Sequence, residues 1–285
     1  MKEKKIALVE LMGGLGNQLH QLVFAKYLEK NDFNVYVSEK WYNSKSFVDG
    51  TTKREVEVNL IDFGLKKVNN KLHLKFQTLD KVLRNPFSRK FYNSNSNKIY
   101  KFYSGDDFNK QSFHKYSWFK GYWQNRDYLT IDKAEVIKFL KKNINFKLEN
   151  NYASNTLVHI RKSDYISWGE DLPNDYYLKS LKILSDRNLL TNYDIFTDDL
   201  NIDRNNDLYM NCNNLIYNPD ENPIKVLSKM MSYKNFIIAN SSLSFFAAFL
   251  GSDKSSIITY PEPWFKSISH KTYRESNWIA VNYLD

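Results

Sequence analysis

The stretch IALVELMGGLGNQ, from Ile6 to Gln18, decides the fold class of this chain. Its first part, Ile6–Leu11, is a short run of residues that favour β-strands, and it ends at a cluster of glycines. Three of the nine glycines in the chain, Gly13, Gly14 and Gly16, lie within four residues. Such a concentration marks a point where the backbone bends sharply or approaches a ligand closely.

A helix and a second strand are predicted directly after the glycines. Asn17–Lys30 has apolar residues at helical spacing, and Asn34–Val37 has the composition of a short strand. A strand, a glycine loop, a helix and a strand in this order form a βαβ unit, which places the two strands in a parallel sheet. The fold class expected for the chain is therefore α/β.

A second α/β series is predicted in the C-terminal half. It follows a polar stretch, Asn145–Asn155, that has the composition of an inter-domain linker. The strands expected in this half are Thr156–Ile160, Asp194–Thr197, Phe236–Ala239 and Ser256–Thr259, and the helices are Asp175–Leu189, Pro223–Ser232 and Leu243–Leu250. We therefore expect two α/β domains, residues 1–150 and residues 151–285.

The first half is less regular beyond its opening βαβ unit. Residues 53–107 are polar and rich in Asn and Lys, and their pattern assigns no helix or strand. Order returns at Trp118–Gln124, and a helix is predicted from Thr130 to Asn143.

The composition restricts the class of protein and of partner. With 42% hydrophobic and 26% charged residues, the chain is expected to be a soluble globular protein rather than a disordered one. The single cysteine, Cys212, can form neither an intramolecular disulfide nor a zinc site of cysteines, which favours a reducing compartment. No signal peptide or transmembrane segment is predicted. The net charge of +9 favours an anionic partner, although a lysine-rich solvated surface would give the same value.

The glycine loop is the first candidate site. Between a strand and a helix, glycines let backbone N–H groups face an anion, and the helix N-terminus adds a partial positive charge. The loop departs from the dinucleotide-binding fingerprint because Leu19 stands at its third glycine position, although Glu39 lies near the end of the next strand. A tight turn without a ligand is the alternative.

The segment His159–Tyr165 follows a strand, at the sheet edge where α/β proteins bind ligands. Two adjacent cations, Arg161 and Lys162, suit a pyrophosphate, and a guanidinium can hold it through two parallel hydrogen bonds. The alternatives are an ion pair between Arg161 and Asp164, and a His159 that simply packs in the core.

Two further strand ends carry polar residues. Asp198 and Asp199 follow one strand, where a carboxylate can accept hydrogen bonds from a ribose or a base, or cap the next turn. The sequence has no Asp-x-Asp, and two neighbouring acids alone make a poor Mg²⁺ site. Asn240–Ser244 precedes an apolar helix and suits either another anion or a plain N-cap. Together these sites predict a nucleoside diphosphate ligand in a cleft between the domains.

Five motifs, in this order along the chain, give the sequence a resemblance to a known family. They are GGLGNQLHQ (Gly13–Gln21), GYWQ (Gly121–Gln124), HIRKSDY (His159–Tyr165), FTDD (Phe196–Asp199) and NSSLSFFAAFL (Asn240–Leu250). With them, the chain resembles the α-1,2-fucosyltransferases of glycosyltransferase family 11. The five motifs together are far more specific than any one of them.

The resemblance implies a fold and an activity. The fold would be GT-B-like, with two Rossmann-like domains facing a cleft. Residues 1–150 would form the N-terminal, mainly acceptor-side domain, and residues 151–285 the GDP-fucose-binding domain. The reaction would be an inverting transfer of L-fucose from GDP-β-L-fucose to the 2-hydroxyl of a β-galactoside. It would require no metal and no cofactor.

The resemblance also assigns site residues. Arg161 would bind the donor pyrophosphate, and Arg161 and Asn17 are the expected catalytic residues. His159 and Asp198 would contact the guanosine. The other donor-binding residues would be Gly14, Gly16, Ser241, Ser242 and Leu243. No residue is expected to bind a metal.

This chain departs from the family pattern at a few positions. Lys162 and Ser163 stand where the family usually has Arg-Gly, and His20 stands where it has an aromatic residue. Lys162 keeps the positive charge but lacks the planar fork of arginine. A base must also take the proton of the acceptor hydroxyl, and Glu10, Asp164 and His20 are candidates by position.

The expected partners are GDP-fucose and a galactose-containing oligosaccharide, with no nucleic acid. If the acceptor is lipid-linked, the net charge of +9 would favour peripheral contact with an anionic leaflet. The expected location is the bacterial cytoplasm, at the inner face of the membrane, in the synthesis of a surface polysaccharide such as O-antigen.

Two other classes of protein stay open on the residues alone. An NAD(P)-dependent oxidoreductase is supported by the glycine loop and Glu39, but it leaves the second α/β half unexplained. A basic nucleic-acid-binding protein is supported by the pI of 9.2 and the many aromatic residues. Its lysines, however, are dispersed rather than gathered in a stripe.

Overall fold

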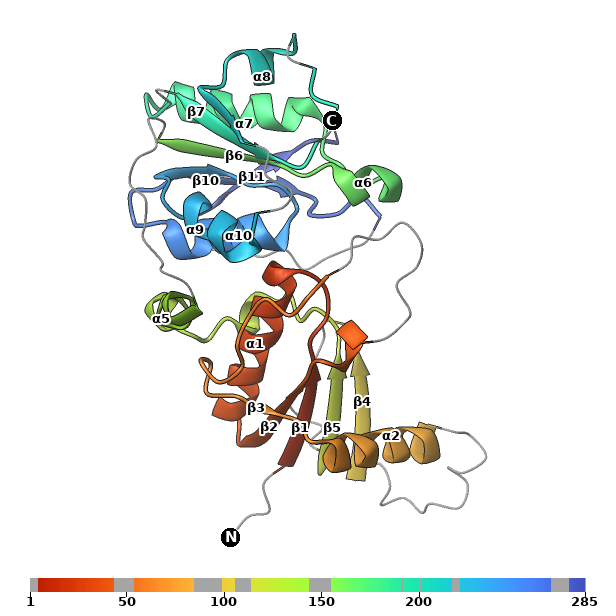
Figure 1. The fold of residues 1–285 in the computed structure, drawn as a ribbon. Coiled ribbons are helices and arrows are strands. Elements are labelled where there is room, and N and C mark those ends of the chain that lie inside the picture. The colour runs from red at the N-terminus through yellow and green to blue at the C-terminus, as the bar shows by residue number, and fades with distance from the viewer. Residues whose placement is uncertain are drawn as a thin grey trace. The chain divides into compact units, whose positions relative to one another are not determined.

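The computed structural model in Figure 1 describes residues 5–43, 54–84, 99–105, 114–143, 155–190, 192–199, 201–203, 205–216, 221–267 and 277–284. The chain divides into two compact units, Met1–Glu135 and Val136–Asp285. Both are α/β, as the sequence predicts. Residues 145–154 of the expected linker lie outside the described residues.

The first unit is built on a sheet of five parallel strands in the order β3-β2-β1-β5-β4. The strands are β1 (Lys5–Glu10), β2 (Phe33–Ser38), β3 (Lys66–Lys67), β4 (Tyr100–Ser104) and β5 (Tyr116–Lys120). The helices are α1 (Leu15–Lys30) and α2 (Asn70–Arg84), with short 3-10 turns η1 (Lys40–Asn43) and η2 (Arg126–Tyr128). Helix α5 (Lys133–Asn143) spans the division between the units.

The predicted βαβ unit is confirmed, and it forms the centre of this sheet. Strand β1 lies between β2 and β5, so that Ala7 is opposite Val35 on one side and Ser117 on the other. A strand with neighbours on both edges and helices on its faces is buried, and this explains the apolar run that the sequence shows.

A helix also lies in the polar segment where the sequence pattern assigned none. Helix α2 places Leu72, Phe76, Leu79 and Leu83 on one face, against a core cluster that includes Leu8 of β1. These positions recur at helical spacing, so the signal was present among the surrounding Asn and Lys residues.

The second unit has a sheet of six parallel strands in the order β11-β10-β9-β6-β7-β8. The strands are β6 (Thr156–Ile160), β7 (Tyr193–Thr197), β8 (Asn214–Ile216), β9 (Asn235–Ile237), β10 (Ile258–Glu262) and β11 (Ile279–Asn282). The helices are α6 (Ser163–Trp168), α7 (Asn174–Asp186), α8 (Asp207–Met210), α9 (Pro223–Met230) and α10 (Ser242–Gly251).

The predicted elements of this half are present, with shifted ends. Helix α7 ends at Asp186 rather than Leu189, because Asn188 has a positive φ of 57° that no α-helix accepts. Strand β10 begins at Ile258 rather than Ser256, because Ser256 closes a turn with Asp253. The short elements α6, α8, β8 and β11 were not predicted.

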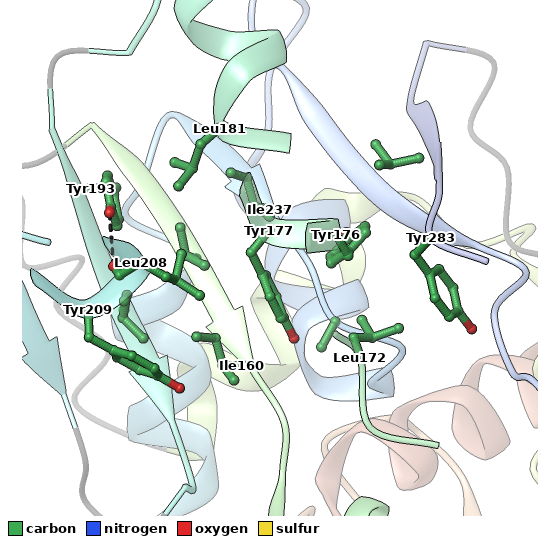
Figure 2. Packing of buried hydrophobic residues seen from close by; sticks show 14 of the residues in the cluster. Ile160, Leu172, Tyr176, Tyr177, Leu181, Tyr193, Leu208, Tyr209, Ile237 and Tyr283 are labelled. Carbon is green, nitrogen blue, oxygen red and sulfur yellow. Dashed lines mark hydrogen bonds between the residues drawn. The ribbon is translucent and has the colours of Figure 1, made fainter. Parts of the chain in front are cut away.

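Five tyrosines are buried among aliphatic residues in one core cluster of the second unit, and Figure 2 labels them. Tyr176 and Tyr193 satisfy their hydroxyls on backbone carbonyls, those of Ile238 at 2.5 Å and Leu208 at 2.9 Å. Each ring therefore contributes apolar area to the core while its oxygen keeps a hydrogen bond. This use explains part of the high tyrosine content of the chain.

Among the described helices, none combines the length and the apolar character needed to cross a bilayer.

Candidate functional site

Arg161 lies directly after β6 and is held by two carboxylates. Its Nη2 donates to Asp164 Oδ1 at 2.6 Å, and its Nη1 forms an ion pair with Asp198 at the end of the neighbouring strand β7. The ion pair with Asp164 expected as an alternative is thus present, but it belongs to a larger network. All three side chains are only partly exposed, which strengthens their mutual attraction relative to a surface pair.

Asp198 connects the ends of β6 and β7. Besides Arg161, its Oδ1 accepts the backbone N–H of Lys162 at 2.7 Å, and its carbonyl accepts the Ser163 hydroxyl at 3.3 Å. Asp199 caps the following turn, since its side chain accepts the backbone N–H of Asn201 at 2.9 Å. Asp198 is therefore a bridge between two strand ends rather than a turn cap.

His159 lies on β6 two residues before Arg161, and it is buried. Burial lowers the pKa of His159 below its ordinary value; Asp198 opposes this shift and Arg161 reinforces it. The imidazole is therefore neutral at pH 7, with one nitrogen that donates and one that accepts. Its Nδ1 has no hydrogen-bond partner among the described residues, so a polar ligand could supply one.

Lys162 takes different partners from those of Arg161. Its Nζ donates to Asp171 at 2.9 Å and to the Leu172 carbonyl at 3.0 Å, so it fastens the loop that follows α6. The two adjacent cations of the motif thus have separate tasks in this structure. The departure from the family pattern at Lys162 coincides with this structural role.

Helix α10 presents an uncapped N-terminus. Ser241 is its N-cap residue and makes no side-chain capping bond, while the Ser244 hydroxyl donates back to the Ser241 carbonyl at 3.2 Å. The plain serine N-cap expected as an alternative is therefore not formed. Ser242 and Leu243 open the helix, where backbone N–H groups have no partner within the helix and attract anions.

Two of the motifs in the second unit are joined by a hydrogen bond. The Tyr165 hydroxyl, in the segment that follows β6, donates to the Asn240 carbonyl at 3.1 Å, directly before the serines of α10. The structure therefore brings His159, Arg161, Asp198 and the α10 N-terminus to the carboxyl edge of one sheet.

The glycine loop of the first unit lies between β1 and α1. Gly13 has a φ of +77°, and a Cβ there would lie 2.5 Å from the Asn17 Nδ2 atom, so only glycine fits. Gly14 is the N-cap residue of α1 and has no side-chain cap, and Gly16 is buried in the first turn. The glycine loop therefore forms a tight turn, and no side chain caps the first backbone N–H groups of α1.

Buried carboxamides hold this loop in place. Gln18 Nε2 donates to the carbonyls of Gly13 at 3.2 Å and Glu55 at 2.7 Å. Asn17 is oriented by Gln124, whose Nε2 donates to Asn17 Oδ1 at 2.7 Å. Two of the five sequence motifs, which contain Asn17 and Gln124, therefore meet in space.

One candidate residue in this unit was missed. Arg54 places its guanidinium beside Gly14, since a Cβ on that glycine would lie 3.8 Å from it. Nothing in the polar segment around Arg54 distinguished it from the other cations. It adds a charged donor near an otherwise neutral loop.

The three positional candidates for the base lie in different settings. Glu10 and His20 are buried in the first unit, and burial raises the pKa of Glu10 although Lys120 and Trp118 oppose the shift. Asp164 lies in the second unit, in the ion pair with Arg161. Among the residues that the structure describes, no three His, Cys, Asp or Glu side chains gather into a metal-binding group.

The chain has two units, each built on a parallel sheet, and the candidate site residues follow the carboxyl ends of the strands. This is an α/β protein of the GT-B-like class. The chain belongs to glycosyl transferase family 11, whose sequence pattern matches residues 7–282.

Two curated relatives come from Escherichia coli. The α-1,2-colitosyltransferase is 28% identical over 52% of this chain and 56% of its own length. The O-antigen biosynthesis glycosyltransferase WbnK is 30% identical over 45% of each chain. The chain thus spans about half the length of the curated relatives that it matches.

A solved structure shows the same fold. A mutant of Arabidopsis thaliana FUT1 in complex with GDP superimposes with a TM-score of 0.53. The superposition covers 90% of this chain and 70% of that one, at 11% sequence identity.

Proposed function

We propose that this chain transfers L-fucose from GDP-β-L-fucose to the 2-hydroxyl of a β-galactoside in a surface glycan. The transfer inverts the anomeric centre and needs no metal ion. The arrangement at the end of β6 carries the proposal, because a guanidinium, a neutral buried imidazole and the open amides of α10 lie at one sheet edge. Membership of glycosyl transferase family 11 supports it.

In this proposal, Arg161 and the α10 N-terminus stabilise the charge on the departing GDP. Arg161 is occupied by Asp164 and Asp198 in the structure. A guanidinium has five N–H donors, so it can keep Asp198 and exchange Asp164 for a phosphate oxygen. The preorganised N–H groups of Ser242 and Leu243 would meet the second phosphate without reorganisation.

His159 and Asp198 would recognise the guanosine. A neutral imidazole can accept from, or donate to, the base or ribose, and a carboxylate accepts N–H and O–H groups. The donor-binding residues proposed in the first unit are Gly14, Gly16 and Asn17, and Gln124 orients Asn17.

The reaction is a single displacement on an oxocarbenium-like centre. The bond from the fucose anomeric carbon to the GDP oxygen breaks, and a bond to the acceptor 2-oxygen forms on the opposite face. The proton of the acceptor hydroxyl passes to a base, and the GDP oxygen keeps the electron pair of the broken bond.

The decisive experiment is a calorimetric titration with GDP, ADP, UDP and NAD, each in EDTA and then in Mg²⁺. We expect selective binding of GDP that is unchanged by EDTA and survives added salt. A preference for NAD would favour an oxidoreductase, and binding that disappears with salt would favour a polycation surface for nucleic acid.

A transfer assay then identifies the sugar and the linkage. GDP-fucose and GDP-colitose are compared with a panel of β-galactosides, and the product is analysed by NMR. GDP-colitose is the second donor because one relative of this chain is named as an α-1,2-colitosyltransferase. An α-1,2-fucosylated galactoside supports the proposal, whereas transfer of colitose alone or attachment at another hydroxyl contradicts it.

The proposed location is the cytoplasmic face of the membrane, where a lipid-linked acceptor would be presented. The net charge of +9 supports peripheral contact with an anionic leaflet. Sedimentation with vesicles measures this contact: we expect more binding to anionic than to neutral vesicles. Equal binding would contradict it.

A further inference from the structure

Helix α6 exposes an unusual apolar surface directly after the Arg161 segment. In this six-residue helix, Ile166 is 54% exposed and Trp168 is 58% exposed. Exposed indole area costs free energy in water, so a tryptophan held in this way at a sheet edge indicates a binding surface.

A second aromatic side chain supports Trp168. The ring of Tyr165 lies 5.6 Å from the Trp168 ring at an interplanar angle of 36°, and 6.5 Å from the ring of Phe265. Its hydroxyl is fixed on the Asn240 carbonyl. We call Tyr165, Trp168 and Phe265 the aromatic platform.

Hydrogen bonds anchor the chain at the end of α6, directly after Trp168. Gly169 ends the helix in the left-handed conformation, with a φ of 71°, and the next residue, Glu170, accepts Asn240 Nδ2 on its carbonyl at 2.8 Å. The Glu170 carboxylate accepts the backbone N–H groups of Lys266 at 2.7 Å and Ser267 at 3.0 Å. Burial acts to raise the pKa of Glu170, but hydrogen bonds from Ser267 and Lys266 lower it below its ordinary value. The carboxylate therefore stays ionised and holds the segment after β10.

The platform is continuous with the Arg161 network. The Arg161 guanidinium carbon lies 5.5 Å from the centre of the Tyr165 ring. A ligand on the platform would therefore lie next to the group that faces the donor phosphates in the proposed function.

The chemistry around the platform favours a neutral, hydroxylated ligand. The charges near the platform compensate one another, because Asp164 is paired with Arg161, Asp171 with Lys162, and the buried Glu170 carboxylate accepts two backbone N–H groups. This local neutrality favours an uncharged ligand over an anionic lipid headgroup. An exposed aromatic ring packs against the C–H face of a pyranose, which is such an uncharged, hydroxylated ligand.

We infer that Trp168, supported by Tyr165, forms an acceptor subsite that binds a pyranose ring of the glycan by stacking. This inference rests on the proposed function for the role of the bound sugar. It extends that function by naming a residue that determines acceptor affinity without contributing to donor binding.

The test compares three variants. Trp168→Ala removes the ring, Trp168→Phe keeps an aromatic face, and Leu178→Ala is the matched control, an exposed apolar residue on α7 of the same unit. Thermal unfolding verifies that all three are folded. Saturation-transfer NMR with methyl β-D-galactoside and lactose, in the presence of GDP, reports binding of the sugar directly.

We expect the saturation signal to be lost in Trp168→Ala and kept in Trp168→Phe and Leu178→Ala. In the transfer assay, Trp168→Ala should raise the acceptor KM about tenfold, equivalent to the loss of one aromatic contact, and leave the donor KM within about twofold.

Other outcomes are equally decisive. A weaker GDP affinity in Trp168→Ala would assign the platform to the guanine base and overturn the inference. Loss of vesicle binding with an unchanged galactoside signal would assign it to a membrane and also overturn it. If the wild-type chain binds GDP but transfers no saturation to either galactoside, the inference about the platform is wrong and the donor proposal still holds. If the chain binds no GDP but transfers saturation to a galactoside, and this signal requires Trp168, the donor proposal is wrong and the inference about the platform holds.

Discussion

The carboxyl edges of the two sheets are built from different chemistry. In the first unit, the glycine loop is held by neutral groups, because Gln18 and Gln124 donate to backbone and side-chain carbonyls. In the second unit, Arg161, Asp164 and Asp198 form a network of charges. Neutral hydrogen bonds fix a conformation at any salt concentration, whereas a charge network can exchange one carboxylate for a phosphate.

The comparison suggests a division of labour. In the proposed reaction, the first edge would position groups and the second would supply most of the electrostatic stabilisation. Four substitutions test this division, beginning with the one for which we expect the largest effect.

Arg161→Ala should reduce transfer by two to three orders of magnitude, because a preorganised cationic donor contributes about 3–4 kcal/mol to the transition state. Steady-state kinetics give the rate, and thermal unfolding confirms that the fold survives. Arg187→Ala, which removes an exposed arginine after α7, is the control. Turnover near the wild-type rate in Arg161→Ala would show that the charge network of the second edge does not contribute to the reaction.

Gly13→Ala should destabilise the chain by about 1–3 kcal/mol, because its backbone is left-handed and the new Cβ would collide with Asn17. Gly14→Ala is the matched variant, since Gly14 has a φ of −82° and its nearest neighbouring atom would lie 3.8 Å away. Urea denaturation compares the two. Equal free energies of unfolding would show that the turn does not depend on glycine at position 13.

His159 should make the stability of the second unit fall in mild acid. Its folded pKa is below the unfolded value, so as the pH drops below about 6.5 the unfolded chain takes up a proton that the folded chain does not. The free energy of unfolding then decreases by at most about 1.4 kcal/mol per pH unit.

The variant His159→Gln should flatten this slope between about pH 6.5 and 5. His73→Gln provides the comparison in the first unit, because burial and Lys40 lower the pKa of His73, opposed by Gln77. We expect flattening in that variant too, of smaller size. If His159→Gln keeps the wild-type slope, its imidazole is not the group that titrates.

Gln124→Leu should have the smallest effect. It removes one neutral hydrogen bond to Asn17, so about 1 kcal/mol and a fall in kcat of about fivefold are expected. The ratio of variant to wild-type rates should not change with salt. A salt-dependent ratio would show that the first edge also acts through charge.

Local patterns predicted much of the fold. The strand, glycine loop and helix near the N-terminus and the buried strands β6, β7 and β9 are short apolar runs next to clear turn residues. Helix α2 was missed because its apolar stripe, which includes Leu72 and Phe76, is diluted by lysines and asparagines. Edge strands such as β3 and β8 have two or three residues and leave almost no pattern to recognise.

The candidate site was predictable where its residues lie in recognisable motifs. Arg161 and Asp198 could each be placed after a strand because each follows an apolar run, but only the structure shows that the two strands are neighbours. The ion pair between these two residues, the tie from Lys162 to Asp171 and the proximity of Arg54 to Gly14 depend on side-chain geometry, which no spacing in the sequence reveals. The resemblance to a family supplied the expected roles of residues, but not these contacts.

The continuity of each unit along the chain has a consequence for folding during synthesis. All five strands of the first sheet have left the ribosome once Lys120 is clear, and the unit is complete at Glu135. At about 5–20 residues per second, translation of the 150 residues that follow, 285 − 135, takes about 8–30 s. The first unit therefore has ample time to fold while β6 and its neighbours are still being made.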